Sequence, residues 1–394
     1  MKAVTFTRQL AAEFSLACSI VLAFCSIAAS QIFLGLALAL FLSLRRRPCW
    51  PPGILWAAAF LALTLLAALA SGEPRSALPQ IKKLFLWSLL PLGSTLLTRR
   101  FPGPALAWPL TFVCLASALW SFIEYSTKLN AARLAGKDFY LAYVADRITG
   151  FMSHWMTFSA HMLLAFCLAL SLLLFTRQPL ARRLFLLAAA AVFALAILLA
   201  QTRSVWLGAA CALAFLLFRW RAISLAALPA LLAAAYWLSP TPVQTRMLSI
   251  IRPQGQVDSN SHRAITRETG FRMIAAHPWL GLGPEGPGKQ FDQYLALPRA
   301  LRPLPDGYYG HLHNLYLQYA AERGLPALAC FLIFVAINAR SWWRHPSARS
   351  HFALAVLIGL AAEALFEYNL GDSEVLTPFL ALFGLAAPND SHSA

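Results

Sequence analysis

The sequence predicts an all-α integral membrane protein, and its composition leads to that prediction. Of the 394 residues, 59% are hydrophobic and only 12% are charged. A soluble domain averages about 25% charged residues, so this chain falls outside that class. Such an apolar chain also cannot stay disordered in water. The net charge of +16 would suit nucleic acid only if it formed a basic face. The lysines and arginines instead form short clusters between long apolar runs, so we expect no nucleic-acid partner.

The apolar runs are long enough to cross a bilayer as helices. About 20 helical residues span a hydrocarbon core of about 30 Å, and these runs lack the alternation of barrel strands. We therefore expect one membrane domain over residues 1–394, with a large, partly helical loop at 239–312. The twelve predicted spans are 10–29, 31–44, 54–71, 81–97, 104–123, 154–175, 183–201, 203–219, 222–238, 313–338, 351–370 and 374–387.

The orientation follows from where the arginines fall. Every second loop is basic and holds no acidic residue, whereas the other loops are longer and mix both signs. The positive-inside rule then places both termini in the cytoplasm and segments 124–153 and 239–312 outside. The basic loops carry Arg45–Arg47, Arg99–Arg100, Arg177 with Arg182–Arg183, Arg219 with Arg221, and Arg340, Arg344 and Arg349.

A charged residue lies at the junction of the seventh and eighth spans. Thr202-Arg203 places a guanidinium at or just below the outer interface, where burial in lipid would be costly. Two interpretations remain open. Arg203 either extends to the lipid headgroups or faces a cavity in the bundle and binds an anion there.

The 239–312 segment is too long to be an unstructured connection in a compact protein. Asp258-Ser259-Asn260-Ser261 is typical of a helix start, and the helix should end before His277-Pro278. Arg263, Arg267 and Gly270 share one face of this helix, with Glu268 and Arg272 paired elsewhere. An ordinary solvated helix would explain this pattern equally well. The Pro278–Gly283 turn that follows is rich in glycine, which lets backbone approach a ligand.

A histidine-rich stretch precedes the tenth span. His313, Tyr316 and Leu317 are expected on one helical face at the outer edge of the membrane. A lone interfacial histidine is more often structural than catalytic. His311 and His313 with Asp306 are also legitimate zinc ligands, but no HExxH, CxxC or acid-rich partner set supports a metal.

With these features the sequence resembles the O-antigen ligase and polymerase family of membrane glycosyltransferases (WaaL/Wzy-like). The order and the predicted topology of five short motifs match that family across roughly residues 140–330. Pro326 stands where many members carry a second glycine, and the first five spans match only as generic apolar helices. The motifs are Arg147–His154, Thr202-Arg203, Arg263, Pro278–Gly283, and His313-Asn314-Leu315-Tyr316-Leu317 with Glu322-Arg323-Gly324.

The resemblance implies transfer of a glycan from an undecaprenyl-diphosphate carrier to a lipid A-core or other glycan acceptor, on the periplasmic face of the bacterial inner membrane. It implies an inverting reaction without metal or cofactor. Arginines would stabilise the diphosphate leaving group, and a neutral histidine would take the acceptor proton. We expect Arg203 and Arg263 to bind the diphosphate and His313 to be the base. Weaker candidates for the diphosphate are Arg147, Lys82, Lys83 and Arg267. Supporting positions are Thr202, Asn314, Tyr316 and Glu322.

Two other functions remain open at the level of sequence. Ligase and chain-extending polymerase share this set of residues. A transporter would use Glu363 and Glu367, which are expected on one face of the eleventh span and could relay protons. Alternatively these two acids are buried against arginines. We favour surface chemistry, because a transporter usually shows repeat symmetry and interrupted helices that this sequence lacks.

Overall fold

A computed structural model describes residues 2–72, 74–97, 103–251, 259–296, 304 and 306–386. The predicted basic pair Arg99–Arg100 and the expected helix-start residue Asp258 lie outside the described residues. So does the side chain of the zinc candidate Asp306.

The described residues form helices and no strand, so the all-α prediction is confirmed for them. The α-helices before the large loop are α1 (Lys2–Leu22), α2 (Ile27–Ser43), α3 (Ile54–Ala70), α4 (Leu78–Lys82), α5 (Leu89–Leu92), α7 (Gly103–Leu134), α8 (Phe139–Ala145), α9 (Trp155–Phe175), α10 (Leu180–Leu199), α11 (Arg203–Trp220) and α12 (Leu228–Trp237). Those in and after it are α13 (Thr241–Leu248), α14 (Ser259–Ala276), α15 (Gly286–Lys289), α16 (Phe291–Tyr294), α17 (Leu315–Arg344), α18 (Ala348–Glu363) and α19 (Ser373–Leu385). Short 3₁₀ or π turns cover Pro74–Ala77, Lys83–Ser88, Gly93–Leu97, Ala222–Ala227, Asp306–Tyr309 and Asn369–Gly371.

Five helices among the described residues are long and apolar enough to cross a membrane: Leu106–Leu134, Trp155–Phe175, Leu180–Leu199, Arg203–Trp220 and Leu315–Arg344. Four more apolar helices are shorter, at Ile27–Ser43, Ile54–Ala70, Ala222–Trp237 and Ser373–Leu385. Each overlaps a predicted span, although Leu106–Leu134 continues into the segment 124–153 that the sequence placed outside the membrane. The count of twelve spans stays a prediction.

Several predicted spans differ from the observed helices. The span predicted at 351–370 is shortened because α18 ends at Glu363, and two others differ for local reasons. The span predicted at 10–29 contains the end of α1, a turn, and the start of α2. The turn forms because Ser26 caps α2, its side chain accepting a hydrogen bond from the Ala29 amide. The span predicted at 81–97 is a series of short α, 3₁₀ and π segments. Pro91 inside this series has no amide hydrogen to donate, which interrupts a regular helix.

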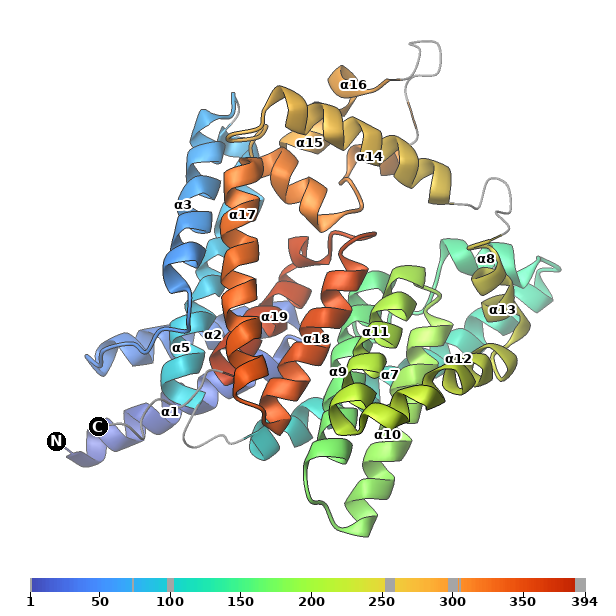
Figure 1. The fold of residues 1–394 in the computed structure, drawn as a ribbon, viewed down its shortest axis with the longest axis horizontal. Coiled ribbons are helices and arrows are strands. Elements are labelled where there is room, and N and C mark those ends of the chain that lie inside the picture. Colours follow the sequence, from blue (N-terminus) through green and yellow to red (C-terminus); the bar gives the residue numbers. More distant parts are fainter. Residues whose placement is uncertain are drawn as a thin grey trace.

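The elements that carry the site come together at one end of the bundle (Figure 1). Helices α3 and α17 stand side by side, and α14 lies above the upper end of α17 and extends away from α3. Helices α11 and α18 pack closely because Gly208 and Gly359 meet: a Cβ atom on Gly208 would lie 2.5 Å from the Gly359 carbonyl oxygen. This crossing brings the start of α11 next to the end of α18.

The large loop has a small apolar core of its own. Met273, Phe291, Leu312 and Leu317 are buried together beneath α14. Gly270 packs against Leu312, where an added Cβ would come within 3.0 Å of Leu312 Cδ1. The loop is therefore folded onto the start of α17, as its length predicted.

The glycine-rich turn at Pro278–Gly283 makes close backbone contacts with helix α17. Helix α17 is broken at Gly324, whose φ of 82° lies in the left-handed region. Leu282 and Gly283 donate backbone hydrogen bonds to the carbonyls of Ala321 and Glu322 at 2.8 and 2.9 Å. A Cβ on Gly324 would lie 2.0 Å from the Trp279 carbonyl oxygen. The turn thus fastens the loop to α17, whereas the sequence suggested an approach to a ligand.

Candidate functional site

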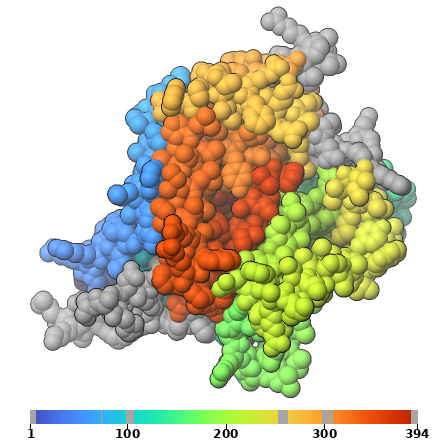
Figure 2. All heavy atoms as spheres, in the orientation of Figure 1, coloured from blue at the N-terminus to red at the C-terminus, as the bar shows by residue number. Residues whose placement is uncertain are grey.

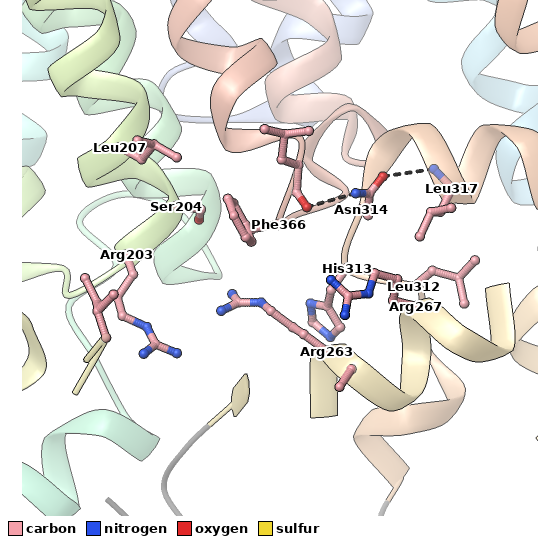
Figure 3. Close-up of a pocket in the computed structure, with 13 residues that line it drawn as sticks. Arg203, Ser204, Leu207, Arg263, Arg267, Leu312, His313, Asn314, Leu317 and Phe366 are labelled. Atoms are coloured by element: carbon pink, nitrogen blue, oxygen red, sulfur yellow. Dashed lines mark hydrogen bonds between the residues drawn. The ribbon is translucent and has the colours of Figure 1, made fainter. Parts of the chain in front are cut away.

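A cavity of about 390 Å³ opens where α11, α14 and the start of α17 meet (Figure 3). In Figure 2 the yellow-orange α14 covers the top of this region, above the orange and red segments. One part of the lining is cationic and another part is apolar. The lining residues are Arg203, Ser204, Leu207, Ile250, Arg263, Ala264, Arg267, Leu312, His313, Asn314, Leu317, Leu365 and Phe366.

His313 lies at this cavity in an unusual backbone conformation. Its φ is 48°, which is rare for a residue other than glycine and often marks a functional site. Asn314 is the N-cap of α17, its side chain accepting a hydrogen bond from the Leu317 amide at 2.9 Å. The expected shared helical face of His313, Tyr316 and Leu317 is therefore wrong for His313, because the helix begins only at Leu315. The left-handed turn instead directs the imidazole toward Glu367.

Glu367 connects the histidine to an arginine. Its Oε2 lies 3.2 Å from His313 Nδ1, and its Oε1 accepts a hydrogen bond from Arg263 at 2.7 Å. The Glu367 side chain is only 4% exposed. A carboxylate at Nδ1 favours the tautomer with its hydrogen on that nitrogen, which leaves Nε2 as the basic atom.

The transporter interpretation required Glu363 and Glu367 to share one helical face, and the structure does not show that arrangement. Helix α18 ends at Glu363, so Glu367 lies in the following turn and not on the same helical face. Glu363 accepts a hydrogen bond from the Asn369 side chain. The alternative, burial against arginines, holds for Glu367 through Arg263.

Arg203 faces the cavity from the side opposite Arg263 and Arg267 (Figure 3). It is the first residue of α11, where the helix dipole also favours an anion. Its guanidinium donates to the Ser249 carbonyl at 3.3 Å, which holds the side chain against the loop. Of the two interpretations open for Arg203, the cavity-facing one describes its position.

Arg147 lies beside this cavity without lining it. It is buried, donates to the Gln201 carbonyl at 3.3 Å and stacks over the Trp155 ring at 5.0 Å. Burial, followed by the charge of Arg246, lowers its pKa. Arg246 is a further buried arginine near the site that no sequence motif indicated.

The two lysine candidates lie away from the arginine cavity. Lys82 is exposed and lines neither this cavity nor the one described below. Lys83 donates to the Gly371 carbonyl and lines the second cavity.

The supporting positions hold the backbone and the walls in place. Tyr316 donates to the Ala361 carbonyl at 3.0 Å, which ties α17 to α18. The hydroxyls of Thr202 and Ser159 are 3.1 Å apart, which ties the start of α11 to α9. Glu322 is buried and pairs with Arg323 at 3.3 Å.

Two more histidines flank His313. The ring of His311 lies 4.2 Å from it and that of His262 lies 4.9 Å from it, centroid to centroid. Burial, followed by the neighbouring His313, lowers the pKa of both rings to about 4. Both are therefore neutral at physiological pH. In the part of the chain that the structure describes, no group of three potential metal ligands comes together.

A second cavity of about 500 Å³ lies on the other side of Glu367. It is lined mainly by polar side chains from segments far apart in the sequence. Three of them are Gln80, Glu285 and Asp372, none of which stands in a motif that the sequence revealed. His311, Glu322 and Glu367 also line it.

Fold and site together define a helical protein of membrane character with a cationic cavity beside a histidine–carboxylate pair. A family model described as O-antigen ligase (Wzy_C) matches residues 188–332, from α10 through the first half of α17. This match confirms the resemblance seen in the sequence over that region. It supports a glycosyltransferase of the O-antigen ligase or polymerase type, with a lipid-linked glycan and a glycan acceptor as the general classes of substrate. No curated protein matches the chain.

Proposed function

We propose that this protein is an O-antigen ligase, which transfers a glycan from undecaprenyl diphosphate to a lipid A-core acceptor without a metal or cofactor. The observation that carries the proposal is the shared cavity: Arg203 and Arg263 face one space, and Glu367 links Arg263 directly to His313. The family match over residues 188–332 supports the same class of reaction.

The proposal includes the membrane arrangement. Twelve spans cross the inner membrane, both termini lie in the cytoplasm, and the cavity faces the periplasm. Apolar side chains along the cavity support access from the bilayer, because Ile250, Leu365 and Phe366 are exposed and line it. A polyprenyl chain would lie against these residues while its diphosphate enters among the arginines.

The arginines bind the leaving group. Guanidinium groups bind phosphate oxygens in a bidentate manner and remain charged, so they suit a diphosphate that gains negative charge in the transition state. Arg203 approaches from α11, and Arg263 and Arg267 approach from α14. Because these positive charges are already present, the step needs no divalent cation.

His313 is the general base. The acceptor oxygen bonds to the anomeric carbon while the bond between that carbon and the diphosphate oxygen breaks. The hydroxyl proton passes to Nε2, and the electron pair leaves with the diphosphate. Glu367 orients the ring and stabilises the imidazolium that forms. Attack opposite the leaving group inverts the anomeric centre.

Reconstitution tests this proposal. The purified protein in liposomes is given lipid-linked glycan and rough lipopolysaccharide, and the products are separated on a gel. The proposal predicts a ladder on the lipopolysaccharide. Elongation of the glycan on its carrier would identify a polymerase instead. Movement of the carrier across the bilayer without a new glycosidic bond would identify a transporter.

A further inference from the structure

The second cavity has its own chemistry, opposite in charge to the first. Of its five carboxylates, Glu322 pairs with Arg323 and Glu367 pairs with Arg263. The other three are Glu285, Asp372 and Glu374, and Lys83 is the lysine that faces them. Burial, followed by Glu374, raises the pKa of Asp372, as expected in a negatively charged enclosure. A phosphate group would be repelled here.

The polar groups of this cavity are held in place by one another. Gln80 donates to Glu285 at 2.6 Å, and Gln318 donates to Glu322 at 2.9 Å. Gln318 and Glu322 are at most 2% exposed. Amides and carboxylates fixed in this way present mostly acceptor oxygens, which match ligands that carry many hydroxyl donors. The volume of about 500 Å³ lies within the range of cavities that bind small molecules.

The cavity also reaches the proposed base. Glu367 and His311 belong to its lining, and both adjoin His313: the first by a hydrogen bond of 3.2 Å, the second by ring contact. The arginine cavity contacts the same histidine. His313 therefore stands between a cationic space and an acidic one.

We propose that the second cavity is the binding site for the acceptor saccharide, and that it selects an unphosphorylated, hydroxyl-rich sugar. This inference rests on the proposed function. It adds Gln80 and Asp372 as residues that determine acceptor specificity, and it divides the substrates by charge: diphosphate beside the arginines, neutral sugar beside the carboxylates.

The test separates acceptor binding from donor binding. Gln80→Leu removes an amide from the cavity, and Asp372→Asn replaces a carboxylate by a neutral amide. Glu268→Gln is the control because Glu268 pairs with Arg272 on the exposed side of α14. Steady-state transfer is measured against acceptor concentration at saturating donor. Binding of lipid-linked donor is measured separately on the same preparations.

We expect each cavity variant to raise the acceptor KM about 10-fold, since each loses or changes a polar group that hydrogen-bonds to the sugar. We expect kcat and donor affinity to stay within about twofold, and the control to match wild type. An unchanged KM in both variants would overturn the inference. A weakened donor affinity with unchanged KM would also overturn it, because the cavity would then bind the donor's sugars.

A binding measurement on the unaltered protein keeps the two proposals distinguishable. Core oligosaccharide, released from lipid A, is titrated by saturation-transfer NMR in its phosphorylated and dephosphorylated forms. The inference predicts tighter binding of the dephosphorylated form, weakened by Asp372→Asn, even in a preparation that transfers no glycan. Equal binding of both forms, or preference for the phosphorylated one, contradicts it.

Discussion

The arginine cavity and the acidic cavity meet at the His313–Glu367 pair, with His313 lining the first and Glu367 lining the second, yet they are built in different ways. The arginines and the histidine of the first stand in short motifs, in a region that matches the O-antigen ligase family model. The second is assembled from six separate stretches of chain between Gln80 and Glu374. The difference indicates that the leaving-group side of the site is specified locally, whereas the opposite side depends on tertiary packing.

Loss of His313 should have the largest effect. His313→Asn is the sharper variant, because asparagine tolerates the left-handed backbone and can still bond to Glu367. We expect transfer to fall by about 10²–10⁴-fold, the usual contribution of a general base. His311→Ala should do much less. Equal loss in both variants together with inactivation of wild type by a chelator would indicate a zinc site.

Loss of an arginine should rank next. Arg203→Ala and Arg263→Ala should each reduce transfer on the order of 10²-fold, because a group that stabilises developing charge is removed. Arg→Lys at either position should also reduce transfer, since a lysine cannot form the bidentate contact. The rates are compared in liposomes at matched protein content. Near-normal transfer by both alanine variants would contradict diphosphate binding and would favour the interpretation that Arg203 only anchors the protein at the membrane interface.

Glu367→Gln should have a smaller effect, about 10-fold on transfer, with a change in the pH profile. The amide keeps an oxygen near His313 Nδ1 but removes the charge that favours the imidazolium. Loss of this charge should move the acid limb of the rate profile to lower pH. Glu268→Gln is again the matched control. A profile that does not move would mean that Glu367 only supports the fold.

The smallest effect concerns stability and pH. The pKa of His311 is lowered to about 4 by burial, against an ordinary value near 6.5. Between these values the unfolded chain binds a proton that the folded protein does not, so stability falls as pH falls from about 6.5 to about 4. His311→Gln should weaken the decrease in thermal unfolding temperature between pH 7 and pH 5. An unchanged decrease would show that other groups cause it.

Sequence reasoning reached the helical fold and one side of the site for identifiable reasons. Apolar length predicts helices, and Arg203, Arg263, Arg267 and His313 stand at helix starts or on one helix face. Sequence reasoning missed two features that depend on where helices begin and end. These are the left-handed turn at His313 and the end of α18 before Glu367. No periodicity signals either feature.

The same limit explains the remaining differences. The Pro278–Gly283 turn was rich in glycine because it packs against the break in α17, a contact that only the folded chain reveals. Gln80 and Asp372 carry no motif, and they face one cavity because their elements pack around Glu322 and Glu367. Residues that come together only through tertiary packing leave no recognisable pattern in the local sequence.

In the proposed mechanism His313 performs the chemistry while the arginines bind the donor, and one paired measurement tests this division of roles most directly. Donor affinity and single-turnover transfer are determined on the same preparations of His313→Asn and Arg263→Ala. We predict that His313→Asn binds lipid-linked donor within about twofold of wild type and transfers at least about 100-fold more slowly. Arg263→Ala should lose donor affinity as well as rate. If His313→Asn transfers glycan at near wild-type rate, or loses donor binding as fully as Arg263→Ala does, the division of roles is contradicted.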